Sequence, residues 1–160
     1  MTSAAPPMFH IVLVTPEIPH NAGAAGRLAL ATGATLHLVR PLGFSLDDKY
    51  VRRTGLDYWS RVDLRLWDSF EELAAAAEPA AGFWFLSTKA PRSPWQAAFK
   101  PGDYLVFGCE TRGLPEPLLA AAGERALCIP MLPGATRSLN LATAVAIVLY
   151  EALRQQNVEW

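Results

Sequence analysis

Apolar residues along the chain gather into short runs that alternate with polar and alanine-rich stretches. The runs have the length of strands, and they are FHIVLVT (9–15), TLHLV (35–39), VDLRLW (62–67), GFWFLST (82–88) and DYLVFG (103–108). Most of them are apolar at nearly every position, which is typical of strands that are buried on both faces of a sheet. The pattern therefore predicts a series of buried strands.

Helical patterns lie between these strands. SFEELAAAA opens with Ser69 and has Glu72 three residues later, which is the spacing of a capping box. The predicted helices are AGAAGRLALATG (22–33), DDKYVRR (47–53), SFEELAAAA (69–77) and SLNLATAVAIVLYEALRQQ (138–156). Two further segments, PEPLLAAA (115–122) and RALCIP (125–130), precede the last helix. Strands that alternate with helices predict an α/β fold with a mostly parallel sheet and helices on both faces.

Length and composition support one soluble domain. A chain of 160 residues with 51% hydrophobic and 18% charged residues is large enough for a core and argues against long disorder. We expect a single domain over residues 1–160, with a disordered or loosely held N-terminus over 1–8. No apolar run has the length of a membrane span, and the N-terminus lacks a basic start, so the sequence predicts a cytoplasmic protein without a membrane partner.

Cysteine usage and charge exclude two further classes of site. Cys109 and Cys128 lie far apart without a CxxC spacing, so we expect two buried thiols and no metal. The net charge of −1 does not favour a general nucleic-acid binder, so any phosphate-binding surface must be local. Basic residues that could form one are Lys49, Arg52, Arg53, Arg61, Arg65, Lys89, Arg92 and Arg137.

Polar and small residues follow the apolar runs directly. The segments are TPEIPHNAGAAGR, STKAPRSP, GCETRGLP and PMLPGATRSLN. Ligands in open α/β sheets bind outside the carboxyl ends of the strands, so we expect these four segments to form the site.

The first segment contains NAGAAG, which is a dinucleotide-binding fingerprint with Asn21 in place of its first glycine. The acidic residue expected after the second strand is also missing, which argues against a Rossmann oxidoreductase. Gly23 and Gly26 could instead allow close packing of the helix on the sheet. Arg27 favours a functional interpretation, because a guanidinium in the first helical turns can reach a phosphate or a reacting hydroxyl.

Three segments together resemble the SPOUT (α/β-knot) RNA methyltransferases. They are NAGAAGR, VFGCETRGLP and IPMLPGATRSLNLATAVAIVLYE. One branch of the family, the TrmL-type tRNA wobble-nucleotide 2′-O-methyltransferases, is similar also in the accompanying segments PEIPHNAG and PLGFSLDDKYVRRTGLDYW. The resemblance extends from Phe9 to Leu153. It implies a deep trefoil knot in the C-terminal part, which periodicity cannot predict.

The resemblance also implies a reaction and its partners. The reaction is methyl transfer from S-adenosylmethionine (AdoMet) to the ribose 2′-hydroxyl of nucleotide 34 in tRNA, a cytidine or a modified uridine. The implied partners are the tRNA anticodon stem-loop and a second copy of the chain, and no metal is required. The alternatives are the same chemistry at another tRNA or rRNA position, and a non-catalytic knotted RNA-binding protein. The second alternative is disfavoured because Arg27 and the glycines are retained.

Site residues carry over from the family motifs. The implied AdoMet-binding residues are Leu86, Gly108, Gly113, Ile129, Leu132, Ser138 and Leu139. A bulky residue at Gly108 is expected to fill the space that the adenosine needs. The implied catalytic residues are Arg27, Asn140 and Tyr150, although a tyrosine in an apolar helix is also typical of simple packing. Glu110 and Arg112 are expected to pair with each other, or to face the RNA or a second chain.

Overall fold

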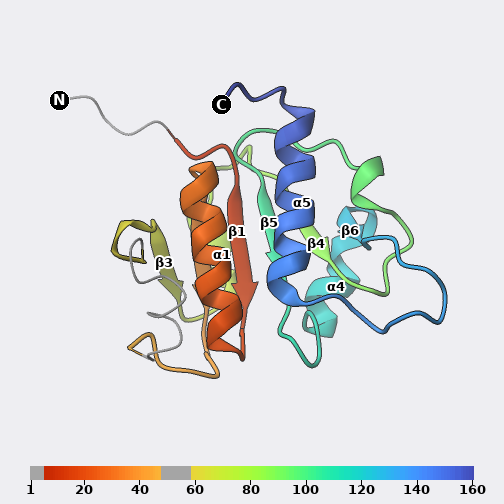
Figure 1. The fold of residues 1–160 in the computed structure, drawn as a ribbon, viewed down its shortest axis with the longest axis horizontal. Coiled ribbons are helices and arrows are strands. Elements are labelled where there is room, and N and C mark those ends of the chain that lie inside the picture. The colour runs from red at the N-terminus through yellow and green to blue at the C-terminus, as the bar shows by residue number, and fades with distance from the viewer. Residues whose placement is uncertain (1–5, 48–58) are drawn as a thin grey trace.

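Six parallel strands form the centre of the structure, a computed structural model that describes residues 6–47 and 59–160 (Figure 1). The strand order across the sheet is β3-β2-β1-β5-β4-β6. The strands are β1 (His10–Val14), β2 (Thr35–Val39), β3 (Leu64–Trp67), β4 (Phe83–Leu86), β5 (Tyr104–Phe107) and β6 (Ala126–Leu127). Every described pairing between them is parallel, so their carboxyl ends lie along one edge of the sheet.

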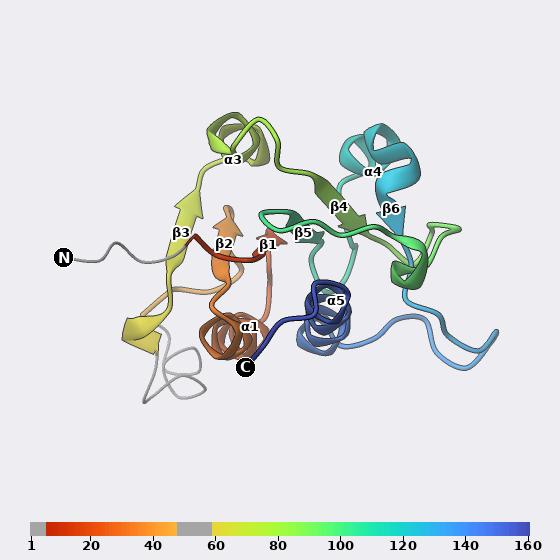
Figure 2. The same cartoon turned by 90° about the horizontal axis from the view of Figure 1, so that it is seen from above.

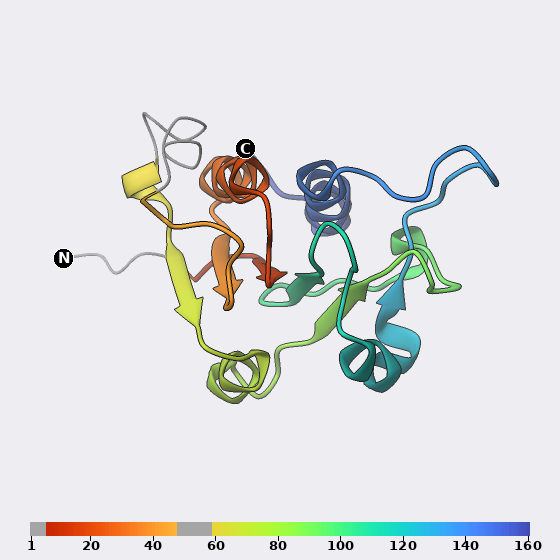
Figure 3. The same cartoon turned by 90° about the horizontal axis from the view of Figure 1, so that it is seen from below.

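Helices cover both faces of this sheet, as Figure 2 and Figure 3 show from opposite sides. One face carries α1 (Pro19–Thr32) and α5 (Leu141–Gln155), which lie side by side. The other face carries the short helices α3 (Phe70–Ala76) and α4 (Glu116–Ala122). Three single 3-10 turns complete the described elements, and they are η1 (Trp59–Arg61), η2 (Pro94–Gln96) and η3 (Gly123–Arg125).

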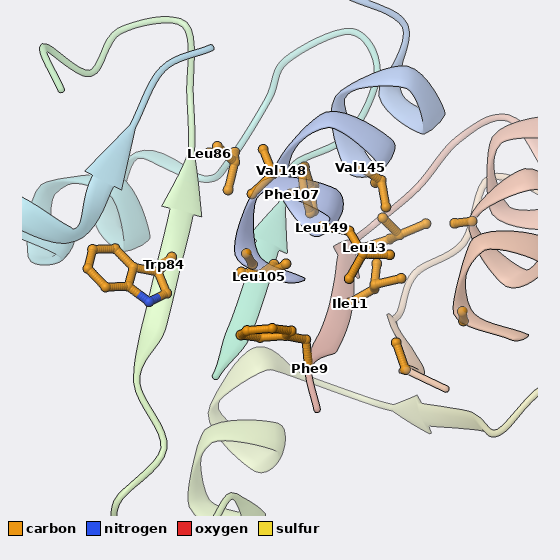
Figure 4. Packing of buried hydrophobic residues seen from close by; sticks show 14 of the residues in the cluster. Phe9, Ile11, Leu13, Trp84, Leu86, Leu105, Phe107, Val145, Val148 and Leu149 are labelled. Carbon is orange, nitrogen blue, oxygen red and sulfur yellow. The ribbon is translucent and has the colours of Figure 1, made fainter. Parts of the chain in front are cut away.

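The larger core lies between the sheet and the pair α1 and α5. Alternate residues of β1 and β5, such as Ile11, Leu13 and Leu105, point toward Val148 and Leu149 of α5 (Figure 4). The buried face of α1 consists of small residues, mainly alanines, so this helix lies close against its neighbours. Burial of this apolar area, at roughly 25 cal/mol per Å², is the main stabilising contribution to the fold.

The opposite face of the sheet contains a neutral histidine pair. His10 and His37 lie 2.8 Å apart between Nδ1 and Nε2, and the indole N–H of Trp67 donates to Nδ1 of His37 at 2.9 Å. The ring of His10 stacks on Tyr104 with a centroid distance of 4.0 Å. Burial lowers the pKa of His10 to about 4 and that of His37 to about 3, even though the charge of Asp63 opposes the change. Both histidines are therefore neutral at pH 7.

The predicted α/β fold is confirmed, with small shifts at element ends. The first helix begins three residues earlier than predicted, because Pro19 with its restricted φ fits the first helical turn. The last helix begins at Leu141 and not at residue 138, because the Asn140 side chain accepts a hydrogen bond from Thr143 N at 3.1 Å and caps the helix. At α3, Ser69 Oγ accepts from Glu72 N as predicted, but the Glu72 carboxylate binds the Asp68 N–H.

Some predictions concern features that the structure does not test. The predicted helix over 47–53 falls almost entirely outside the described residues, as does most of the predicted loose N-terminus. The trefoil knot and the single domain over the whole chain stay predictions. In the part of the chain that the structure describes, no helix has both the length and the apolar character needed to cross a membrane.

Candidate active site

A cavity of about 860 Å³ opens at the carboxyl edge of the sheet, beyond β4 and β5. Its wall comes from four separate parts of the chain: residues 86–89, 107–114, 129–131 and 137–141, with Ile18 and Asn21 added from the start of α1. These are the segments that follow the strands, as the sequence predicts. The volume lies within the range of about 300–1,000 Å³ that is usual for small-molecule sites.

Glu110 connects the loop after β5 to the start of α1. Its Oε1 accepts a hydrogen bond from the N–H of Glu17 at 2.8 Å, and its Oε2 accepts from the N–H of Ile18 at 2.7 Å. Ile18 is the N-cap residue of α1 and has no cap from its own side chain. The Glu110 carboxylate therefore binds backbone N–H groups at the start of that helix, where the helix dipole also favours a negative charge.

Glu17 makes the reciprocal connection. Its Oε1 accepts from the Thr111 N–H at 2.9 Å and from the Thr111 hydroxyl at 2.7 Å. These hydrogen bonds, above all the one from the hydroxyl, lower the pKa of the Glu17 carboxyl below its usual value. Each of the two loops therefore provides a carboxylate that binds backbone N–H groups of the other loop. We call this pair of contacts between Glu17 and Thr111 and between Glu110 and residues 17–18 the loop clasp.

Asn21 extends the network to the third loop. The Asn21 side chain is buried and donates from Nδ2 to Glu110 Oε2 at 3.1 Å. Its Oδ1 accepts from Asn140 Nδ2, also at 3.1 Å, and Asn140 Oδ1 in turn caps α5 through Thr143 N. The two amides thus join the start of α1 to two loops that lie 89 and 119 positions further along the chain.

Gly108 is required by the loop that follows β5. This loop turns back on itself, with hydrogen bonds from Cys109 N to Gly113 O at 3.3 Å and from Gly113 N to Cys109 O at 3.0 Å. A Cβ at position 108 would lie only 2.0 Å from the carbonyl carbon of Gly113 and 2.1 Å from Leu114 N. An added side chain would therefore first meet the chain's own backbone, and the expectation that it fills the adenosine space stays a prediction.

Three cationic side chains lie on the cavity wall and are exposed to solvent, namely Lys89, Arg112 and Arg137. Arg92, which the sequence grouped with Lys89 and Arg137, instead donates to the carbonyl oxygens of Glu124 and Gln96, each at 2.8 Å. Arg65 lies in β3 and pairs with Asp63 at 2.9 Å. Of the predicted basic residues, Lys89 and Arg137 therefore line the cavity, Arg61, Arg65 and Arg92 do not, and Lys49, Arg52 and Arg53 lie outside the described residues.

The family of the chain follows from its sequence profile. The profile of the SpoU rRNA Methylase family matches residues 8–150, which include every residue that lines the cavity. The chain belongs to the SpoU rRNA Methylase family.

Relatives of this SpoU-family chain match it over almost its full length. A protein of Burkholderia ambifaria named tRNA (cytidine(34)-2′-O)-methyltransferase is 48% identical over 156 residues, which are 95% of this chain and 98% of the relative. A solved structure described as "Structural insights into the 2-OH methylation of C/U34 on tRNA" superimposes with a TM-score of 0.89 at 51% identity, covering 96% of this chain and 99% of the other. The AdoMet-bound rRNA methyltransferase of Sinorhizobium meliloti superimposes with a TM-score of 0.78 at 26% identity, over 91% of this chain and 56% of the other.

Most of the residues that the SPOUT resemblance implied meet at the cavity. Six of the seven implied AdoMet-binding residues and the implied catalytic Asn140 line it; the six are Leu86, Gly108, Gly113, Ile129, Ser138 and Leu139. The wall combines apolar side chains with main-chain groups of glycine-containing loops, which suits a ligand with an aromatic base and several polar groups. The chemistry of these residues therefore fits AdoMet.

Three implied site residues do not line the cavity. Leu132 is 78% exposed in the segment between β6 and α5. Arg27 is exposed on α1, about 9 Å further along the helix axis than Asn21. Tyr150 is 45% exposed on α5, and its ring stacks on Trp160 with a centroid distance of 6.2 Å. Each of the three faces solvent in this single chain.

Other expectations about individual side chains are also corrected. Glu110 does not pair with Arg112, because its carboxylate is bound to the start of α1. The two cysteines are free but only partly buried; Cys109 lies on the cavity wall, and burial raises the pKa of the Cys128 thiol. Gly26 allows close packing, but against Trp59 of η1 and not against the sheet, since an added Cβ would lie 2.6 Å from the Trp59 ring.

Sequence reasoning missed Glu17 and the structural use of Asn21. Both lie in the quoted PEIPHNAG segment, but an isolated carboxylate and an amide give no local indication of their partners. The observed helix begins at Pro19 and has Ile18 at its N-cap, whereas the predicted start at residue 22 placed Asn21 there, so the sequence pattern contained no sign that a cap was missing. A helix start without a local cap requires a partner from elsewhere.

Proposed function

We propose that this protein transfers a methyl group from AdoMet to the ribose 2′-hydroxyl of nucleotide 34 in tRNA, a cytidine or a modified uridine. The observation that carries the proposal is the meeting of residues from three family motifs at one cavity of suitable size. The relative from Burkholderia ambifaria, 48% identical over nearly the whole chain, supports the choice of substrate. We further propose a cytoplasmic location, where such a substrate is found.

The proposed chemistry depends mainly on positioning. AdoMet, when bound, supplies a methyl group whose bond to sulfur breaks as the ribose oxygen forms the new C–O bond, with the electron pair left on sulfur. Leu86, Ile129 and Leu139 give the cavity an apolar wall that holds the cofactor and excludes water. Ser138 and Asn140 supply polar groups on the same wall. Glu110 has a structural role, because its carboxylate accepts hydrogen bonds from Glu17 N, Ile18 N and Asn21 Nδ2.

Arg27 has a role in this proposal that depends on the RNA. A guanidinium stays protonated in proteins, so it cannot act as a simple base. From its exposed position on α1 it can hold a phosphate of the bound tRNA and stabilise negative charge that develops on the ribose oxygen. The phosphate itself is then a candidate acceptor for the hydroxyl proton.

The mouth of the cavity suits a polyanion. Lys89, Arg112 and Arg137 come from three different segments and line one cavity, although the net charge of the whole chain is −1. Such local clustering is what phosphate contacts require. We propose that these three cations bind backbone phosphates of the anticodon stem-loop beside the target ribose.

A homodimer is also part of the proposal. Large apolar side chains are exposed on and near α5; Tyr150 is 45% and Trp160 77% exposed. Such side chains are costly to leave in water and favour a protein contact. A second copy against α5 would cover Tyr150 and Trp160.

The test is nucleoside mapping. Unmodified tRNA is incubated with the protein and methyl-labelled AdoMet, digested, and analysed by mass spectrometry with the label mapped to position. We expect a 2′-O-methylated ribose at position 34. Label at another tRNA position, or only in rRNA, would support the same chemistry on another substrate, and binding of tRNA without any label would support a non-catalytic RNA-binding protein.

A further inference from the structure

We infer that Asn21 is a positioning residue for methyl transfer, which acts by fixing the side-chain amide of Asn140 on the cavity wall. The inference rests on the proposed function, and it gives a role to Asn21, for which the family motifs implied none. It depends on three hydrogen bonds that run in series from Glu110 through Asn21 and Asn140 to Thr143. We call this series the amide relay.

The orientation of the Asn21 amide is set by Glu110. An ionised carboxylate only accepts hydrogen bonds, so the side of Asn21 that faces Glu110 Oε2 must be the NH₂ group. The oxygen of the same amide must then face Asn140. Because Asn21 is buried, water does not offer it alternative partners, and this single orientation is strongly favoured.

The same reasoning applies to Asn140. Its Oδ1 accepts from the backbone N–H of Thr143, and its Nδ2 donates to Asn21 Oδ1. A flipped amide would point a donor at the Thr143 N–H and an acceptor at the Asn21 oxygen, so both contacts would become unfavourable. A carboxamide nitrogen carries two hydrogens, and the bond to Asn21 uses one of them. The second remains for a ligand, because Asn140 lies on the cavity wall and is exposed to it.

A fixed hydrogen-bond donor at this place has a defined use. Negative charge develops on the ribose oxygen as it loses its proton and attacks the methyl group. A donor that is already oriented stabilises this charge without reorganisation during the reaction. A freely rotating amide would present its oxygen for part of the time, and that oxygen would repel the developing charge.

The amide relay is separable from the loop clasp. Glu110 binds the N–H groups of Glu17 and Ile18 without help from Asn21, and Glu17 binds Thr111 at a site outside the relay. Asn21 is thus the residue whose change interrupts the relay while both carboxylates keep their backbone contacts.

Two substitutions at position 21 separate positioning from stability. Asn21→Leu has nearly the same shape but removes the acceptor that orients Asn140. Asn21→Asp keeps an acceptor for Asn140 but places a second carboxylate next to Glu110, which costs stability unless the pair shares a proton. Glu17→Leu serves as the matched control, because it weakens the loop clasp and leaves the relay intact.

The variants are compared by single-turnover methylation of tRNA with saturating AdoMet, by calorimetric titration of AdoMet and by thermal unfolding. For Asn21→Leu we expect a rate lower by on the order of tenfold or more, with the AdoMet dissociation constant changed by about threefold at most. For Asn21→Asp we expect the lower melting temperature of the two but a rate at least about threefold above that of Asn21→Leu. For Glu17→Leu the loss should be mainly in melting temperature.

A rate that follows melting temperature across the three variants would overturn the inference, and so would a rate for Asn21→Asp as low as that of Asn21→Leu. If Asn21→Leu does not fold, Asn140→Asp takes its place, because its carboxylate still accepts from Thr143 but offers no hydrogen to the cavity. A parent-like rate for Asn140→Asp would also overturn the inference. Failure of the proposed function is distinct, since the parent protein would then not methylate nucleotide 34.

Discussion

Replacement of Gly108 by alanine tests the role of the loop after β5. The added Cβ would lie 2.0 Å from the carbonyl carbon of Gly113, whereas ordinary contact begins at 3.4 Å. The two arms of the loop must therefore separate by about 1.4 Å, the difference between these distances. The obstacle is backbone, which cannot move aside by a change of rotamer.

The cost follows from two contributions. Overpacking of this kind costs about 1–3 kcal/mol. Separation of the arms also weakens the two hydrogen bonds between Cys109 and Gly113, at about 1 kcal/mol each. We expect Gly108→Ala to lower the free energy of unfolding by about 3–5 kcal/mol. In a domain of this size that corresponds to a melting temperature lower by roughly 6–20 °C.

The assay is thermal unfolding together with calorimetric titration of AdoMet. Gly134→Ala is the matched control, because this glycine has a φ of +74° and an added Cβ would meet no atom within 4 Å. It should cost only the strain of a left-handed alanine, about 1–2 kcal/mol. If Gly108→Ala lost AdoMet binding while its melting temperature fell no further than that of Gly134→Ala, the backbone-clash argument would be refuted and the adenosine-space explanation supported.

Three further predictions concern other parts of the molecule. The pKa of His10 is about 4 and that of His37 about 3, below the ordinary 6.5, so as the pH falls these histidines become protonated in the unfolded chain before they do so in the folded protein. Urea denaturation should therefore give a lower free energy of unfolding at pH 5 than at pH 7, and equal values would contradict the neutral histidine pair. Arg27→Ala should reduce the rate of single-turnover methylation by on the order of a hundredfold with little change in AdoMet affinity, and Arg27→Lys should restore little of that rate. A near-parent rate for Arg27→Ala would remove Arg27 from the mechanism. Sedimentation at micromolar concentration should give a dimer that Tyr150→Glu weakens, and a monomeric parent would refute the proposed contact.

Much of the fold could be predicted from the order of residues alone. Strands such as β2 and β5 are buried on both faces and therefore read as continuous apolar runs, whose period needs no tertiary information. The location of the site followed from the same pattern, because parallel strands bring their carboxyl ends to one edge. The residues of the cavity wall were inferred from motifs, and six of the seven implied cofactor-binding residues line it.

The partners of individual side chains were decided only by the tertiary structure. Glu110 contacts a helix start 92 positions away, and Asn21 meets Asn140 across 119 positions, so no local pattern indicates either contact. The same limit explains the clash at Gly108, which depends on how the loop closes, and the outward position of Tyr150 on α5. Hydrophobic periodicity reports which face of an element is buried, whereas a hydrogen bond between loops depends on distances that exist only after the strands have paired.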